Sequence, residues 1–136
     1  MAIRVSSVPV PLDINTADWV TAFFDTADLC NADATAEWFA DDIDMRFANN
    51  PPASNKVEAR EGLRKFMSTI AGMAHQRQER IEDGTVAVQL AIVHYTLPNG
   101  AKVSLPVASH LRRNADRLLD RLWIYIDLAP LFDPTK

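Results

Sequence analysis

Cysteine is almost absent from this sequence. Cys30 is the only cysteine in 136 residues, which excludes an internal disulfide framework and a thiolate metal cluster. A cytoplasmic setting fits this composition best, because disulfides are typical of oxidising compartments. Cys30 falls on the apolar stripe of a predicted helix, so we expect an inert, buried thiol.

Long basic runs are absent as well. No run is longer than the pair Arg112 and Arg113, and the formal net charge is −4 at pH 7. A nucleic-acid partner is not expected, since phosphate neutralisation requires a basic face.

The N-terminal stretch lacks the continuous apolar run of a signal peptide or membrane span, because Pro9 and Pro11 interrupt it. We expect no membrane partner from it. Residues 1–13 are predicted to form an extended arm. Residues 14–136 are predicted to form a single domain, since a chain of this length builds one core.

Familiar catalytic motifs are missing. The sequence contains no Gly-rich phosphate loop, no Gly-x-Ser-x-Gly elbow and no His-Glu-x-x-His pattern. Its three histidines fall on different predicted strands without spaced carboxylates beside them. We therefore expect neither a metal site nor a bound cofactor.

What remains is an ordinary globular composition with a clear order of elements. Helical spacing with capping residues predicts a first helix up to about Asn31, a short second helix from Asp33 to Asp42 that contains Trp38, and a third from Asn55 to near Gly72. A two-residue period predicts strands over 43–47, 75–82, 85–97, 102–112 and 117–130. Asp-Gly and Asn-Gly turns make the last four strands a meander.

This order predicts an α+β fold. Helices that precede a long antiparallel sheet must cover one of its faces. We expect a curved antiparallel (mixed) sheet that forms a cone, with three helices on its concave face.

The chain resembles the SnoaL-like branch of the nuclear transport factor 2 superfamily over about residues 14–132. The resemblance is carried by residues 38–42 (Trp-Phe-Ala-Asp-Asp), 46–49 (Arg-Phe-Ala-Asn), 74–75 (Ala-His), 105–106 (Leu-Pro) and 125–127 (Tyr-Ile-Asp). It implies the cone fold. The superfamily includes isomerases, dehydratases, cyclases, epoxide hydrolases and non-catalytic domains, so the fold alone does not imply one activity.

Two catalytic patterns of that superfamily are not retained. Positions that carry polar groups in limonene epoxide hydrolases are occupied here by apolar residues: Leu90, Ile92, Ile124, Met45 and Phe47. The tyrosine and aspartate positions of ketosteroid isomerases correspond to Phe23 and Phe47. Neither set of catalytic groups is available to this chain.

Alternation along the strands predicts which residues line the cone. The apolar set expected to point inward, and so to bind substrate, is Met45, Phe47, Leu90, Ile92, Leu105, Val107, Leu122 and Ile124. Phe23 and Trp38 would complete the wall from the helices. Asn49, at the mouth, would donate a hydrogen bond to a ligand oxygen.

His94 is the main polar residue of this inward set, and His75 opens the strand that follows the third helix, near the mouth. In a dry pocket a neutral imidazole can act as a base near pH 7, so His94 and His75 are the predicted catalytic residues. The structural alternatives are a hydrogen-bonded core histidine for His94 and a histidine that stabilises a helix C-terminus for His75.

The opposite face of the sheet is predicted to form a homodimer interface. It would present Arg46, Gln89, Tyr95, Trp123 and Tyr125, a mixture of aromatic and polar groups typical of partner surfaces. Superfamily members often pair through this face.

The leading functional hypothesis is a cofactor-free isomerase, dehydratase or cyclase that acts on a small hydrophobic, oxygenated molecule by histidine-mediated proton transfer. The alternative is a homodimeric domain that binds a lipophilic ligand, or serves as an accessory domain, without chemistry. A third possibility is a cone whose interior is packed solid.

Overall fold

The computed structural model of the protein describes residues 15–132. The predicted N-terminal arm, residues 1–13, lies outside the described residues. The elements are α1 Trp19–Ala27, α2 Ala32–Ala36, β1 Phe39–Phe47, α3 Lys56–Met67, β2 Gly72–Asp83, β3 Val86–Thr96, β4 Lys102–Arg113, β5 Leu119–Tyr125 and α4 Ala129–Phe132. Within residues 15–132, no helix is long and apolar enough to cross a membrane.

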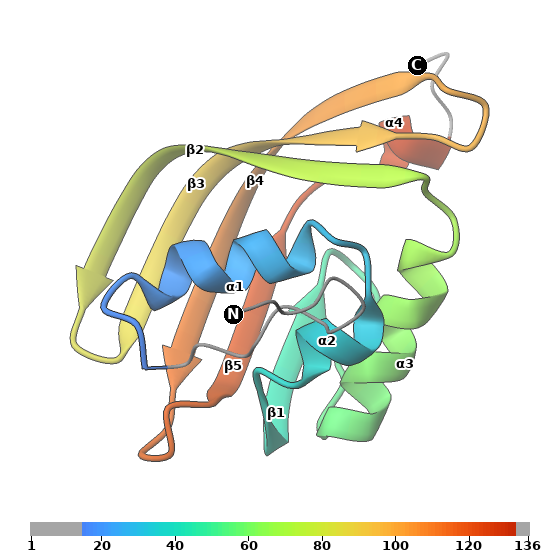
Figure 1. The fold of residues 1–136 in the computed structure, drawn as a ribbon. Helices are drawn as coiled ribbons and strands as arrows, with labels where there is room; N and C mark the ends of the chain where they lie inside the picture. Colours follow the sequence, from blue (N-terminus) through green and yellow to red (C-terminus); the bar gives the residue numbers. More distant parts are fainter. Residues whose placement is uncertain (1–14, 133–136) are drawn as a thin grey trace, which may run out of the picture.

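The five strands form one mixed, open sheet in the order β1-β5-β4-β3-β2. β2 to β5 pair antiparallel as the predicted meander, whereas β1 pairs parallel with β5. Figure 1 shows the sheet strongly bent, with α1, α2 and α3 on one side of it. The predicted α+β cone with three helices on the concave face is confirmed.

Capping side chains fix where the helices begin. Asp18 accepts a hydrogen bond from the Thr21 backbone N–H, and Asn31 accepts one from Ala34. Asn55 accepts one from the Glu58 N–H at 2.9 Å, but the Glu58 side chain accepts the Ser54 N–H, so the predicted capping box forms only in part.

The first helix ends at Ala27 rather than near Asn31, and two further helix ends also differ from the prediction. The second helix ends at Ala36 and does not contain Trp38, because the Trp38 carbonyl already accepts a hydrogen bond from Leu119 in β5. The third helix ends at Met67, and β2 starts at Gly72. In both places pairing with a neighbouring strand takes backbone groups that a longer helix would need.

Two apolar clusters form the core between helices and sheet. One joins α1, α2 and α3 to β1 and β5, and the other lies under β3, β4 and the α4 segment. Phe66, Met73, Cys30 and Ile124 pack against both clusters. The space between these bridging residues contains the cavity described next.

Candidate functional site

A small cavity lies between the concave face of the sheet, α1 and α3. Its volume is about 50 Å³, room for roughly four water-sized groups. The wall is predominantly apolar and includes Phe23, Phe47, Val107, Leu122 and Ile124. These residues were predicted to line the cone, and they do. The interior is therefore hollow but narrow.

His75 brings a titratable group to this apolar wall, where it pairs with Asp28. Its Nδ1 lies 2.6 Å from Asp28 Oδ1, and its backbone N–H donates to Asp28 Oδ2 at 2.9 Å. Both side chains are largely enclosed, and the imidazole packs against the Phe24 ring. Because a carboxylate only accepts, Nδ1 carries the proton and Nε2 is left as the basic nitrogen.

Nothing in residues 15–132 hydrogen-bonds that Nε2. An oriented imidazole with a free basic nitrogen in an apolar cavity is suited to accept a proton from a ligand. Asp28 was not predicted from the sequence. A signal for it exists, because an aspartate at a helix C-terminus is disfavoured by the helix dipole and so suggests a specific partner.

A β-bulge in β2 decides which side chains reach the concave face. The pairing with β3 shifts between Arg77 and Glu79, so that His75 pairs with Val93 and Arg80 pairs with Gln89. The extra residue reverses the alternation, so both His75 and Arg80 point inward although an odd number of positions separates them. Arg80 donates to Asp18 at 2.7 Å.

Tyr95 lies diagonally across from His75 on the same face of the neighbouring strand. It is 3 % exposed, lines the cavity and stacks edge-to-face on Phe66. Burial raises the pKa of its hydroxyl, and nearby Cys30 and Asp28 raise it further. No group in residues 15–132 hydrogen-bonds the hydroxyl, so it remains a neutral donor for a ligand oxygen.

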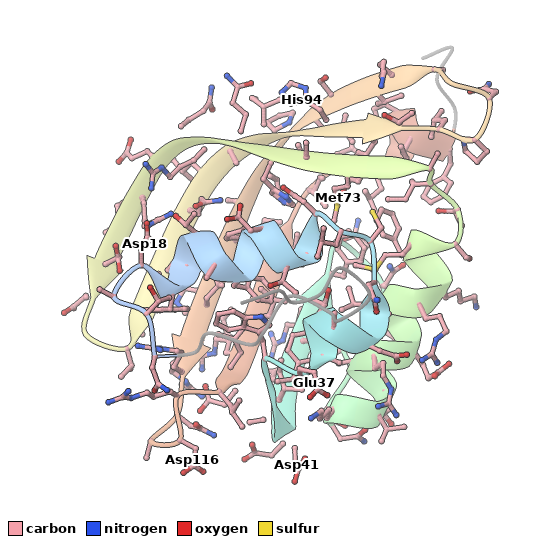
Figure 2. The ribbon with its side chains drawn as sticks, viewed as in Figure 1. Asp18, Glu37, Asp41, Met73, His94 and Asp116 are labelled. Carbon is pink, nitrogen blue, oxygen red and sulfur yellow. The ribbon has the colours of Figure 1, made fainter. Side chains whose placement is uncertain are left out.

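His94, the first catalytic candidate, lies on the wrong face for that role. Figure 2 shows it on the outer side of the bent sheet, whereas Met73 lies on the helix side. It is exposed, and its ring nitrogens contact Ser104 Oγ at 2.7 Å and Gln76 Oε1 at 2.8 Å. Leu90 and Ile92 share that outer face, so their predicted inward positions are wrong too.

The error is in the alternation of β3. The inward residues of β3 are Ala87, Gln89, Ala91, Val93 and Tyr95, all buried. Gln89 and Tyr95 were therefore wrongly predicted to lie at an outer interface. The inward row includes small residues such as Ala87 and Ala91, whereas bulky apolar residues such as Leu90 and Ile92 lie on the outer face. A prediction that places the larger apolar side chains inward therefore assigns the two faces of β3 the wrong way round.

The remaining predicted pocket residues divide into two groups. Trp38, Met45 and Leu105 are buried in the core without lining the cavity. Asn49 lies in the loop after β1 and lines a separate, outer pocket. Cys30 is half-buried. Burial, and to a smaller extent the nearby Asp28 carboxylate, raises the pKa of its thiol, which keeps the thiol protonated.

On the outer face, Trp123 stacks with arginines. The Arg46 and Arg121 guanidinium groups lie 4.3 Å and 4.1 Å from its ring centroid, and Arg46 also pairs with Asp44. Tyr125 is 60 % exposed. In residues 15–132, no group of three or more His, Cys, Asp or Glu side chains is arranged to hold a metal ion.

The family follows from a comparison with protein-family models. The model of the SnoaL-like domain matches residues 20–121. The chain belongs to the SnoaL-like family. No curated protein matches this SnoaL-like domain.

Solved structures show the same fold at low sequence identity. An NTF2-like protein of unknown function from Burkholderia pseudomallei is 17 % identical, with a TM-score of 0.73 over 84 % of this chain and 92 % of that one. A putative SnoaL-like polyketide cyclase from Shewanella denitrificans is 9 % identical, with a TM-score of 0.72 over 84 % and 91 %. An epoxide hydrolase from M. tuberculosis, similar to limonene epoxide hydrolase, is 15 % identical, with a TM-score of 0.68 over 84 % of each chain.

Proposed function

We propose that this SnoaL-like domain catalyses proton transfer on a carbonyl-bearing, mainly apolar molecule, as an isomerase or cyclase of that general type. The His75–Asp28 pair in the wall of an apolar cavity carries the proposal. Among structures of the same fold, one is described as a putative polyketide cyclase and another as an epoxide hydrolase, which supports an enzymatic role.

In the proposed step, His75 Nε2 accepts a proton from the carbon next to the substrate carbonyl. The C–H electron pair forms the carbon–carbon double bond of an enolate, and the carbonyl oxygen gains the negative charge. Tyr95 donates a hydrogen bond to that oxygen, and Asp28 stabilises the imidazolium. His75 then returns the proton to another carbon, or the enolate carbon attacks an internal carbonyl carbon and closes a ring, and the alkoxide formed from that carbonyl takes the proton back from His75.

The test is deuterium exchange of small ketones, for example acetone and 2-butanone, in D₂O, followed by mass spectrometry. We expect His75→Asn to lower the exchange rate by about 100-fold or more, since a positioned base contributes roughly that much. Tyr95→Phe should lower kcat more than it changes KM. His94→Asn is the matched control and should retain the rate within about twofold.

Equal exchange with the wild type and His75→Asn would contradict the catalytic role of the pair. A thermal melt and a circular dichroism spectrum of each variant separate a lost base from a lost fold. If the loss of exchange activity in Asp28→Asn were fully explained by a loss of folded protein, the pair would serve only to hold α1 against β2. A ligand-binding domain without chemistry would then be the better description.

We also propose a homodimer through the outer sheet face, with Arg46, Trp123 and Tyr125 in the interface. One cross-strand row on this face joins exposed Leu90, Ala108 and exposed Tyr125, and such apolar rows favour association. Sedimentation should give a dimer for the wild type and a monomer for Tyr125→Glu. A wild-type monomer at about 100 μM would refute this interface. A cytoplasmic setting remains part of the proposal, based on the cysteine content.

A further inference from the structure

A second, larger pocket lies beside the inner cavity and opens to solvent. Its volume is about 630 Å³, against about 50 Å³ for the inner cavity. It lies where the loop after β1, the second half of α3 and the segment between β5 and α4 meet. Its apolar lining includes Phe66, Ile126, Leu128 and Phe132.

Phe66 is the partition between the two spaces, because its side chain lines both. Its ring packs edge-to-face against Phe47 at 4.8 Å and against Tyr95 at 5.7 Å, measured between ring centroids. Leu122 and Ile124 of β5 line the inner cavity, and Ile126, just after the strand, lines the outer pocket. The apolar floor is thus shared by both spaces.

The inner cavity alone is too small for a substrate. Ligand sites typically enclose about 300–1,000 Å³, whereas this cavity admits only a few heavy atoms. A longer molecule with one end at His75 would have to extend beyond this cavity, and the outer pocket lies on the other side of Phe66.

The polar groups of the outer pocket favour an oxygen-rich ligand end. Lys65, Asn49 and Asn50 line it, and no ion pair or hydrogen bond in residues 15–132 engages the Lys65 ammonium or the two amide groups. Asp127, the one carboxylate of the lining, uses Oδ1 to accept the Ala129 backbone N–H. The Thr69 hydroxyl donates to the Phe66 carbonyl. Lys65 thus supplies a positively charged donor, and each asparagine offers an N–H donor beside its acceptor oxygen.

We infer that the outer pocket is a second compartment of the substrate site, which holds the carboxylate end of an elongated amphipathic substrate while its apolar end passes Phe66 toward His75. This inference rests on the proposed function for the meaning of the inner cavity. Lys65 and the two asparagines bind the carboxylate, and Phe66 selects against a bulky apolar end.

The test uses binding of decanoate, decanol and 8-phenyloctanoate, measured by isothermal titration calorimetry on the full chain. We expect decanoate to bind more tightly than decanol. Lys65→Gln should weaken decanoate by about fivefold, the size of an exposed charge pair, and leave decanol within twofold. Lys56→Gln, at the other end of α3 and outside the pocket, is the matched control and should change neither.

The gate is tested with Phe66→Ala and the milder Phe66→Leu. The wild type should bind 8-phenyloctanoate more weakly than decanoate, and Phe66→Ala should tighten the phenyl ligand by at least fivefold. Phe66→Leu should give an intermediate change if the alanine variant melts too early to measure. No binding of decanoate at millimolar concentration, equal binding of acid and alcohol, or an unchanged preference in both Phe66 variants would overturn the inference.

The two proposals fail separately. The binding assay requires no turnover, so it reports on the second compartment independently of the proposed reaction. If decanoate binding follows the expected pattern but ketone exchange is the same in His75→Asn, the proposed reaction is wrong and the second compartment stands. If ketone exchange depends on His75 but Lys65→Gln binds decanoate as tightly as Lys56→Gln does, the proposed reaction stands and the second compartment is wrong.

Discussion

The ion pair that holds the start of α1 on the sheet gives a prediction that needs no substrate. Asp18 Oδ1 accepts a hydrogen bond from the Thr21 backbone N–H at 3.2 Å and one from Arg80 Nη1 at 2.7 Å. The Arg80 side chain is only 10 % exposed, and it also donates to Thr21 Oγ1 and Gln89 Oε1. Asp18 is therefore both a helix cap and the counterion of an enclosed guanidinium.

Two substitutions separate these roles. Asp18→Asn keeps a good N-cap and removes the charge, which should cost about 1 kcal/mol because the carboxylate is more than half exposed and solvent screens the pair. Asp18→Ala also removes the cap and should cost about 2 kcal/mol. Asp25→Asn, an exposed aspartate of the same helix, is the matched control and should cost less than about 0.5 kcal/mol.

The pKa of Asp18 determines how the stabilisation by this ion pair changes with pH. Burial acts to raise the pKa of Asp18, but hydrogen bonds from Thr21 and Arg80 outweigh it, so the pKa is lowered in the folded state. A lowered folded pKa contributes stability above the unfolded value of about 3.9, and this contribution is lost as the pH falls through the folded pKa. Urea unfolding should therefore show the full difference between the wild type and Asp18→Asn at pH 6 to 7, narrowing below about pH 4. A difference that does not change with pH, or that equals the Asp25→Asn control, would refute the reasoning.

Three further outcomes are expected from other parts of the structure. Asn55→Ala should lower the unfolding free energy by about 1 kcal/mol in urea and Asn55→Ser much less, because the side chain caps α3; equal losses would contradict the cap. Ser109→Ala should raise stability by up to about 1 kcal/mol, since this 2 % exposed hydroxyl in the cavity wall has no hydrogen-bond partner in residues 15–132; a loss of stability would show an unrecognised partner. The variant Tyr125→Phe leaves Tyr95 as the only tyrosine of the sequence. Ultraviolet absorbance should then show that Tyr95 ionises at a higher pH in the folded than in the urea-unfolded protein, and the unfolding free energy should fall as the pH rises above about 10. Ionisation of Tyr95 at a lower pH in the folded protein would contradict its burial.

The fold could be predicted because its signals are local. Capping side chains mark the starts of α1 and α3, and Asp-Gly and Asn-Gly turns mark the meander. Pairing between β1 and β5 joins residues far apart in the sequence, and this pairing ends the second helix before Trp38. Long-range pairing of this kind is not visible in a local pattern.

The facing of β3 was predictable from its hairpin, although its composition pointed the other way. Leu97 and Ala101 close the loop of Pro98, Asn99 and Gly100, since the Leu97 N–H donates to the Ala101 carbonyl. Counting back from this pair places Val93 opposite Leu105, and opposed residues share a face. Leu105 was expected inward, so Val93 and Tyr95 had to be inward and His94 outward. Turn geometry is the stronger guide to register when both rows of a strand are apolar.

The bulge at Gln78 is the feature that makes the site, and removing it is the sharpest test of how the chain builds it. Asp18 and Asp28 lie ten helical positions apart, about 15 Å at 1.5 Å per residue. His75 and Arg80 pair with Val93 and Gln89, which lie four strand positions apart, about 13 Å. The spacing of Asp18 and Asp28, at the two ends of α1, is thus close to that of Arg80 and His75 in β2. Both ion pairs can form only if Arg80 and His75 face inward together, and the extra residue in β2 makes this possible. Deletion of Gln78 should turn one of the pair outward, lower the unfolding free energy by at least about 2 kcal/mol and lower ketone exchange with it, whereas Gln78→Ala keeps the residue count and should be nearly neutral. A stable, active deletion variant would show that α1 reaches its place without these two contacts, and the His75–Asp28 pair would then lose its structural basis.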